Sequence, residues 1–368
     1  MPDAPVSKKL RVLFVARAFP PQIGGIERQN FELYTALSET CETGLIVNRR
    51  GRTFLPIFFF AALFRLAFMI RRYDVVLLGD ATLGILAWLI GIFSNKPVAC
   101  IVHGLDITWP NPLYQRLWPR FFLTRADRLI AVGNETIRQG SMRGLAEEKF
   151  IFVPNGVNVP ATLPERTRAG LEQYLGTPIA GKKLLLTVGR LVRRKGIAWF
   201  VRHILAELDE DTLYIVAGDG PERQAILDAA KQAGVQQRLV LTGVVNEAQK
   251  ELLYRAADLF VQPNIEVEGD IEGFGLVVLE AAATGMAVIA SDLQGLKDAV
   301  CDGQNGLLVE PGNTSAWVNR MRACLADEAD CKALGVRARE YVAQHFTWQQ
   351  IAADYLGILE ALHKERCS

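Results

Sequence analysis

The sequence of 368 residues lacks several signatures of common protein classes. Its six cysteines form no Cys-x-x-Cys pair and no Cys/His spacing typical of zinc sites, so we expect free thiols in a reducing cytosol. The net charge of +1 gives no general signal for nucleic-acid binding. The Gly-x-Gly-x-x-Gly fingerprint and the Gly-x4-Gly-Lys-Ser/Thr loop are both absent. These absences argue against a zinc protein, a dinucleotide oxidoreductase and a P-loop NTPase.

A leader and a membrane-spanning run are also missing. Residues 1–9 are polar and lack the apolar core of a signal peptide, so we expect none. The aromatic run at residues 54–70 is shorter than the roughly 20 apolar residues of a spanning helix, and it contains Pro56 and Arg65. Burial against a sheet and docking on a membrane surface both remain open for this run. Arginines without acidic residues at positions 49–72 favour an anionic membrane surface.

The sequence does contain a regular alternation of short apolar runs with helical segments. Continuously apolar strands separated by helices indicate a parallel sheet that is covered on both faces. In the first half, strands are predicted at residues 11–16, 45–47, 73–78, 97–102, 128–132 and 149–153. In the second half, strands are predicted at residues 184–188, 213–216, 239–241, 259–261 and 288–290.

A Pro- and Gly-containing break at residues 157–182 separates the two halves. We therefore predict an α/β protein of two Rossmann-like domains facing a central cleft. The first domain comprises residues 1–156 and is completed by an amphipathic C-terminal helix at about 348–368. The second domain comprises residues 157–347. Ligands of such sheets bind at the carboxyl ends of the strands, which directs attention to the loops there.

Two carboxylates eight residues apart, Glu272 and Glu280, flank the start of an apolar segment, residues 276–283, that reads as a buried helix. Gly273 and Gly275 have no Cβ and would let the backbone approach a ligand. The helix amides would suit an anion such as a phosphate. Two helical glutamates are commonly only solvated. Glu280, however, interrupts an apolar run and needs a partner if it is buried.

Two further loops carry residues suited to phosphate. Gly24 and Gly25 follow the first strand and open a helix, where bare amides would face a diphosphate; the alternative is an ordinary strand–helix turn. Arg190 and Lys195 follow the first strand of the second half and would converge on phosphate oxygens, unless they are simply solvent-exposed.

One histidine stands out because it ends an almost purely apolar strand. His103 is followed by Gly104, and it either functions at a cleft or caps the sheet. Asp106 is a candidate to orient it.

Taken in order, these segments resemble glycosyltransferase family 4, a large retaining family with the glycosyltransferase-B fold. The resemblance covers almost the whole chain. It is carried by Pro-Pro-x-x-Gly-Gly-x-Glu at 20–27, His-Gly at 103–104, Pro-Asn-Gly-Val at 154–157, Thr-Val-Gly-Arg-Leu at 187–191, Lys-Gly at 195–196, Ala-Gly-Asp-Gly-Pro at 217–221, the motif at 272–280, Ser-Asp at 291–292 and the Gly-rich segment at 303–312.

The resemblance implies a role for each phosphate-side residue. Gly24 and Gly25 would approach the donor diphosphate through backbone N–H groups. Arg190 and Lys195 would neutralise that diphosphate as it leaves, in place of a metal ion. His103 would lie near the anomeric carbon.

The resemblance also implies which residues bind the rest of the donor. Glu272 and the backbone that follows it would hold the sugar, Glu280 would hold the ribose hydroxyls, and residues 242–245 would lie near the base. The donor-binding residues implied in this way, besides the two glycines of the first loop, are Val244, Gly273, Phe274, Gly275 and Glu280.

One departure from the family pattern lies directly before the motif. Residues 263–272 insert extra acidic residues, and Glu266, Glu268 and Asp270 could face the donor sugar or the acceptor. They leave open which carboxylate meets the sugar, although the spacing favours Glu272. They are also the only hint of a metal site, which we do not expect, because Arg190 and Lys195 supply the positive charge.

We therefore expect a retaining, metal-independent glycosyltransferase that uses a nucleotide-diphospho-sugar donor and no other cofactor. The expected acceptor is a lipid-linked saccharide or a cell-surface polysaccharide precursor, as in lipopolysaccharide synthesis. The expected location is the cytoplasm, with peripheral contact to the inner face of an anionic membrane through residues 49–72. Two alternatives remain: a nucleotide-sugar epimerase on the same fold, and a non-catalytic partner subunit that binds a sugar nucleotide.

Overall fold

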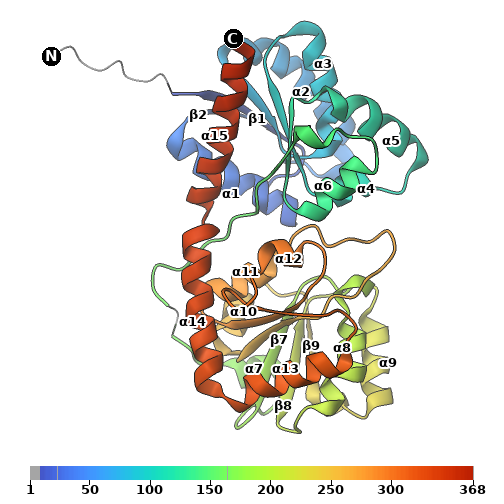
Figure 1. Cartoon of the computed structure of the whole chain (residues 1–368), viewed down its shortest axis with the longest axis vertical. Coiled ribbons are helices and arrows are strands. Elements are labelled where there is room, and N and C mark those ends of the chain that lie inside the picture. Colours follow the sequence, from blue (N-terminus) through green and yellow to red (C-terminus); the bar gives the residue numbers. More distant parts are fainter. Residues whose placement is uncertain (1–8, 23, 164, 368) are drawn as a thin grey trace, which may run out of the picture. The chain divides into compact units, whose positions relative to one another are not determined.

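A computed structural model describes residues 9–22, 24–163 and 165–367, without the side chain of Arg52. The predicted absence of a signal peptide therefore lies largely outside the described residues. The chain divides into two compact α/β units, Met1–Gly156 with Trp348–Ser368, and Val157–Thr347. Each unit contains one six-stranded parallel sheet (Figure 1).

The sheet of the first unit has the strand order β2-β1-β3-β4-β5-β6. Its strands are β1 (Arg11–Ala16), β2 (Glu42–Val47), β3 (Val75–Leu78), β4 (Val98–Val102), β5 (Arg128–Ala131) and β6 (Phe150–Phe152). Its helices are α1 (Gly25–Thr40), α2 (Leu55–Met69), α3 (Gly84–Phe93), α4 (Leu105–Thr108), α5 (Pro112–Leu117), α6 (Asn134–Ser141) and α15 (Trp348–Cys367).

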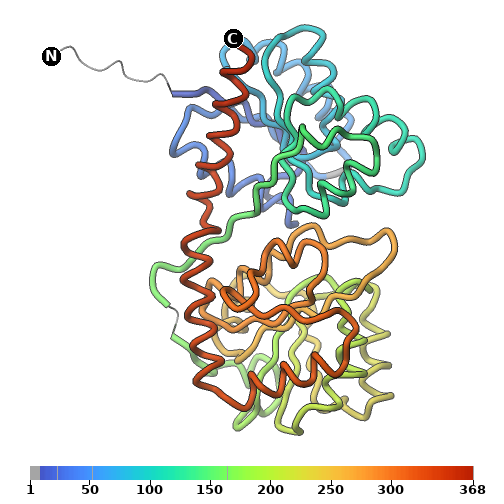
Figure 2. The backbone as a smooth tube through the Cα atoms, viewed as in Figure 1, coloured from blue at the N-terminus to red at the C-terminus, as the bar shows by residue number. Residues whose placement is uncertain are grey.

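The C-terminal helix α15 belongs to this first unit although it is last in the chain. It lies beside α1, and Figure 2 shows the red end of the chain running along the blue N-terminal segment. Ile351, Tyr355 and Leu362 are buried, which is the face that helical spacing predicts. Ile358, predicted on the same face, is only half-buried, and Leu359 is fully buried instead.

The second sheet has the order β12-β11-β10-β7-β8-β9. Its strands are β7 (Lys183–Val188), β8 (Thr212–Ala217), β9 (Leu239–Gly243), β10 (Leu259–Gln262), β11 (Ala287–Ser291) and β12 (Leu307–Val309). Its helices are α7 (Leu171–Leu175), α8 (Ile197–His203), α9 (Arg223–Ala233), α10 (Glu247–Ala256), α11 (Leu276–Ala283), α12 (Leu296–Ala299), α13 (Thr314–Ala326) and α14 (Glu328–His345).

The strand order places a switch point in each sheet. In the second unit the chain builds outward from β7 through β8 to β9, and then returns to the other side of β7 with β10. In the first unit the corresponding point lies between β1 and β3. Loops after strands on either side of such a point diverge and leave a crevice at the carboxyl edge, where ligands of α/β sheets bind.

Helix α2 contains most of the aromatic run at residues 54–70, and the structure shows which of its side chains are buried. Phe58, Ala62 and Leu66, spaced by four residues, are buried in the core of the first unit. Phe60, Phe64 and Phe68, on the opposite face, are between 66% and 78% exposed. The run is thus buried on one face and open on the other. Within the described residues, no helix combines the length and apolar character needed to cross a bilayer.

Candidate functional site

The loops after β7 and β10 meet at the switch point of the second sheet. Gly218, directly after β8, lets the loop after β8 pack closely on the loop after β7, because a Cβ there would lie 1.8 Å from the carbonyl oxygen of Gly189. Gly196 has a φ of +64°, and a Cβ on it would lie 1.9 Å from the carbonyl oxygen of Pro263. Neither position accepts a side chain, and Gly196 is the one that brings the loop that carries Lys195 against the loop that leads to Glu272.

Lys195 and Glu272 form a buried ion pair at this edge. The Lys195 Nζ lies 2.6 Å from the Glu272 Oε2, and each side chain is 9% exposed. A buried charge of either sign is costly without its partner, so each group holds the other in place. Sequence analysis placed both residues in the site, and the structure brings them together.

The Oε2 atom of Glu272 is the contact point for several donors. Besides Lys195, the Asn264 Nδ2 donates to it at 2.9 Å, and the Arg194 Nε lies 3.5 Å away. Asn264 is itself held by the Gln262 Nε2, which donates to its Oδ1 at 2.5 Å. No described residue hydrogen-bonds the other oxygen, Oε1, which leaves it able to accept from a ligand.

The electrostatic state of Glu272 follows from these neighbours. Burial is the largest influence and by itself raises the pKa of this carboxyl. The charges of Lys195 and Arg194, together with the hydrogen bonds from Lys195 and Asn264, outweigh it and hold the pKa below its ordinary value. Glu272 is therefore an anion at neutral pH.

The backbone of Glu272 is fixed as well. Its N–H donates to the Gln294 Oε1 at 2.8 Å, and its carbonyl accepts from the Gly295 N at 3.1 Å. Gln294 adopts a φ of +46°, which is uncommon for a residue other than glycine. The carboxylate is thus anchored at side chain and main chain.

The turn after Glu272 leads into α11, where the Leu276 N–H donates to the Phe274 carbonyl and the Val278 N–H to the Gly275 carbonyl, each at 3.0 Å. Gly275 is the N-cap and no side chain caps this end. A Cβ at Gly275 would lie 2.7 Å from the Leu296 Cδ2, and the predicted approach of a ligand to this backbone stays a prediction. The glycine serves packing against α12. Phe274 is buried, and half-buried Gly273 precedes it.

Glu280 lies two turns into α11 and has partners in α10. The Tyr254 hydroxyl donates to its Oε2 at 3.1 Å, and the Lys250 Nζ lies 3.4 Å from the same oxygen. The partner that a carboxylate in an apolar run requires is therefore present. These contacts orient Glu280, and they are also compatible with a purely structural role.

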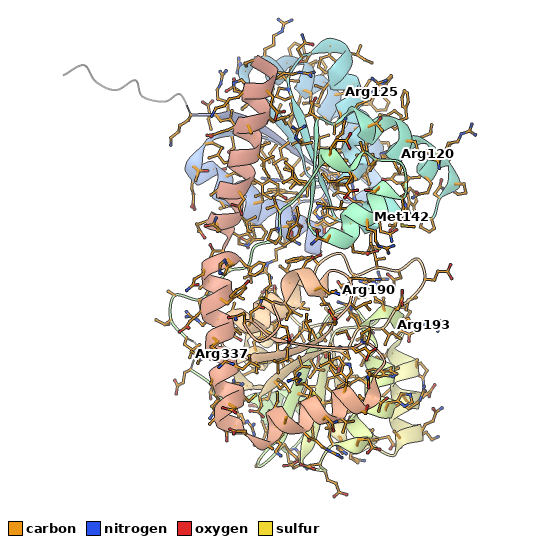
Figure 3. All side chains as sticks on the ribbon, in the orientation of Figure 1. Arg120, Arg125, Met142, Arg190, Arg193 and Arg337 are labelled. Carbon is orange, nitrogen blue, oxygen red and sulfur yellow. The ribbon has the colours of Figure 1, made fainter. Side chains whose placement is uncertain are left out.

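Arg190 and Val244 are exposed. Arg190 forms no ion pair with any described residue and lies on the same loop as exposed Arg193 (Figure 3). Val244 directly follows β9, at the edge of the sheet, and is 80% exposed. Both belong to loops at the carboxyl edge, where a ligand would reach them.

The inserted acidic residues differ in their surroundings. Glu266 and Glu268 are exposed. Asp270 is paired with Arg194, whose NH1 lies 2.8 Å from its Oδ1. Within the part of the chain that the structure describes, no three His, Cys, Asp or Glu side chains cluster as metal ligands would.

In the first unit, Gly24 and Gly25 form the start of α1. Gly24 is the N-cap, no side chain caps the helix, and both glycines are exposed. The Glu27 carboxylate lies against this end of the helix, since a Cβ on Gly24 would be 2.1 Å from the Glu27 Oε2. Neighbouring Ile23 lies outside the described residues.

His103 lies buried after β4, with its ring held by the main chain. Its Nε2 contacts the Gly79 carbonyl at 3.0 Å. A carbonyl only accepts, so Nε2 carries the hydrogen and Nδ1 is the nitrogen left for a ligand. Asp106 does not orient the ring as predicted. Its Oδ1 accepts from the His103 backbone N–H, and its Oδ2 accepts from the Ala81 N–H. Burial raises the pKa of this carboxyl.

Sequence analysis missed an ion pair at the switch point of the first sheet. The Arg17 Nε, after β1, lies 3.0 Å from the Oδ1 of fully buried Asp80, after β3. Burial opposes the charge of Arg17, and Asp80 raises its pKa in spite of this. The only sequence signal was a charged residue directly after an apolar strand, and nothing in the sequence paired it with a residue 63 positions away.

Each half of the chain matches a model of a known protein family. Residues 23–160 match the family model described as Glycosyltransferase Family 4. Residues 177–341 match the model described as Glycosyl transferases group 1. This chain belongs to glycosyltransferase family 4.

Individual relatives agree with this assignment. The chain is 30% identical to the D-inositol 3-phosphate glycosyltransferase of Nocardia farcinica over 262 residues, which are 68% of this chain. That match spans only 56% of the relative's own length. The chain is 26% identical to the GDP-mannose-dependent alpha-(1-6)-phosphatidylinositol monomannoside mannosyltransferase of Mycolicibacterium smegmatis, with coverage of 74% of this chain and 72% of the relative.

A solved structure shows the same fold. The Anabaena protein HepE in complex with UDP-glucose matches 96% of this chain and 100% of its own, with a TM-score of 0.74 and 19% identity. At this identity the likeness establishes the fold alone. The chain therefore has the two-domain α/β fold of such glycosyltransferases, as the sequence predicted.

Proposed function

We propose that this protein is a retaining glycosyltransferase that transfers a sugar from a nucleotide-diphospho-sugar to a hydroxyl group of a lipid-linked saccharide or cell-surface polysaccharide precursor. The observation that carries the proposal is the buried Lys195–Glu272 pair at the switch point of the second sheet. It supplies a cation for a diphosphate and a carboxylate oxygen for a sugar, side by side. Family membership supports the reaction class, and retention of configuration rests on the family resemblance.

Departure of the nucleoside diphosphate is the step that the basic residues would assist. As the bond from the anomeric carbon to the phosphate oxygen breaks, negative charge develops on the diphosphate and positive charge on the sugar. Lys195 and the exposed Arg190 would stabilise the diphosphate, and the family resemblance implies that backbone N–H groups at Gly24 and Gly25 would add donors. We propose that these groups suffice and that transfer requires no divalent ion.

Recognition of the donor would use the carboxylates. Glu272 would accept a sugar hydroxyl through Oε1, since Oε2 is occupied by Lys195 and Asn264. Glu280 would accept the ribose hydroxyls, in the orientation that Tyr254 and Lys250 give it. Residues 242–245 would lie near the base. His103 would offer Nδ1 near the anomeric carbon, since Nε2 is held by Gly79.

The proposed acceptor is lipid-linked because the first unit presents a surface suited to a membrane. A hollow of about 550 Å³ beside α2 is lined by apolar side chains and by Arg49, Arg50 and Arg65, without an acidic residue. The exposed aromatic face of α2 adjoins it. Aromatic side chains at an interface and arginines facing anionic headgroups are the two contributions that peripheral binding needs. The lipid acceptor in the name of the Mycolicibacterium relative points the same way.

We propose peripheral contact with the cytoplasmic face of an anionic membrane through residues 49–72. Nucleotide sugars and the reducing environment that suits six free cysteines are both found on that side.

Calorimetry with a panel of nucleotide sugars in the presence of EDTA tests the donor site. We expect one donor to bind wild type, Lys195→Ala to weaken binding by about a hundredfold or more, and Arg190→Ala to weaken it by about tenfold. Arg193→Ala is the matched control, because Arg193 is an exposed arginine on the same loop. Absence of binding by every donor would overturn the proposal, and binding that needs a divalent ion would overturn its metal-independent part.

A further inference from the structure

The acidic segment 265–271, which departs from the family pattern, is fastened at both ends by one residue. The Ile265 N–H donates to the Arg194 carbonyl at 2.9 Å, and the Arg194 NH1 lies 2.8 Å from the Asp270 Oδ1. Main chain and side chain of Arg194 thus close the segment into a loop. Glu266 and Glu268, between the two fastenings, are exposed and carry no part of this contact.

The loop ends at the sugar-binding carboxylate. Asn264, on one side of the loop, donates to the Glu272 Oε2, and Asp270 on the other side is only two residues from Glu272. The guanidinium of Arg194, 16% exposed, contacts Asp270 and has its Nε 3.5 Å from the Glu272 Oε2. Arg194 therefore links the loop to Glu272.

The four charged side chains around Glu272 are electrically neutral as a group before any ligand binds. Lys195 and Arg194 contribute two positive charges, and Glu272 and Asp270 contribute two negative charges. Arg194 is thus compensated by Asp270 and differs from exposed Arg190, which has no such partner among the described residues. The guanidinium of Arg194 contacts Asp270 and approaches Glu272, so it is better placed to hold these carboxylates than to bind a phosphate.

We propose that Arg194 is a positioning residue for donor-sugar recognition: by holding Asp270 and Ile265 it fixes the loop that aims the Glu272 Oε1 at a sugar hydroxyl. This inference rests on the proposed function. It adds a residue outside the family motif and gives the inserted segment a role in selecting the sugar.

The binding of two probes distinguishes a role of Arg194 in positioning Glu272 from direct binding of the phosphate by its charge. The first probe is the nucleoside diphosphate, which lacks the sugar, and the second is the nucleotide sugar that wild type binds in the donor panel. We expect Arg194→Ala to leave nucleoside diphosphate affinity within about twofold and to lower nucleotide-sugar affinity by about ten- to a hundredfold, as loss of a charge-assisted hydrogen bond does.

A double-mutant cycle identifies the partner. Asp270→Asn should cause the same sugar-specific loss, and the double variant Arg194→Ala with Asp270→Asn should lose no more than either single variant. Asp270→Glu, which keeps the charge, should restore part of the sugar affinity. Arg193→Ala should change neither probe.

The outcomes are distinct. Loss of nucleoside diphosphate affinity in Arg194→Ala, with a gain in Asp270→Asn, would show that Arg194 binds the phosphate directly and would overturn the inference. Unchanged nucleotide-sugar affinity in both variants would overturn it as well. Failure of wild type to bind any nucleoside diphosphate would instead overturn the proposed function.

Discussion

Lys195 and Glu272 neutralise each other inside the protein, and this constrains what each can do for a ligand. The Glu272 Oε2 is committed to Lys195 and Asn264, so only Oε1 is available to a sugar. Lys195 must remain near Glu272 while it contacts a phosphate, because a buried carboxylate without its cation is strongly destabilised. In the proposed donor site the pair would therefore couple the position of the diphosphate to that of the sugar.

The ion pair between Lys195 and Glu272 predicts how the free energy of unfolding of the variant Glu272→Gln depends on pH. The lowered pKa of Glu272 means that its contribution is fully present above the unfolded value, about 4.3, and is lost as pH falls through the lower folded value. At neutral pH the variant leaves Lys195 uncompensated and should unfold about 3–5 kcal/mol more easily than wild type.

As the pH falls below about 4.3, the difference between wild type and Glu272→Gln should shrink toward zero, because protonated Glu272 resembles glutamine. Urea unfolding of both proteins at a series of pH values measures this difference. A difference that stays constant over the acid range would show that the ion pair does not stabilise the fold.

At the scale of the element, α2 is a helix whose buried face could not be predicted from its sequence, because all its residues except Arg65 are apolar. Apolar residues lie on both of its faces, so the spacing of hydrophobic residues does not distinguish the face that packs on the sheet from the face that is exposed. The structure assigns Phe58, Ala62 and Leu66 to the core and leaves Phe60 and Phe64 exposed. An exposed aromatic face of this kind typically marks an interaction surface.

Replacing Phe60, Phe64 and Phe68 with Ser should weaken binding to phosphatidylglycerol liposomes by about a hundredfold or more, since burying a Phe side chain contributes about 1.5–3 kcal/mol. Flotation of the purified protein measures this. Melting temperature should be nearly unchanged, because the three side chains are exposed.

Leu227→Ser, which alters an exposed side chain of α9, is the control and should not change flotation. Changing Arg49, Arg50 and Arg52 to Ser should remove the preference for anionic over neutral liposomes. Equal flotation of wild type and both multiple variants would contradict the proposed membrane contact.

Secondary structure was largely predictable because most strands are apolar runs bounded by polar or Gly/Pro residues. Leu276–Ala283 was predicted to the residue. Strand β12 (Leu307–Val309) was missed, since three residues, two of them only half-buried, give too short a pattern. The bounds of the other strands differ by at most three residues, as at Glu42 in β2.

At the scale of the whole molecule, the order of strands in each sheet determines which loops lie next to one another. Local sequence patterns, such as apolar runs and turn residues, do not specify that order. The pairing of Arg17 with Asp80 spans 63 residues, and that of Arg194 with Asp270 spans 76. Neither could be predicted without the sheet topology. Lys195 was named as a basic residue after an apolar strand and Glu272 as a carboxylate before an apolar helix, and the family motifs mark both as well. Asn264, Gln294 and Arg194, which position them, lie outside those motifs.

We propose that the whole molecule transfers a sugar. The most direct test is incubation of the protein with its donor, labelled in the sugar, and a membrane lipid extract, followed by measurement of label in the lipid fraction and of released nucleoside diphosphate. We predict one nucleoside diphosphate released for each sugar transferred, with EDTA present, and a loss of about a hundred- to a thousandfold in Lys195→Ala. Donor binding without transfer to any acceptor, or conversion of the donor sugar without an acceptor, would contradict the account.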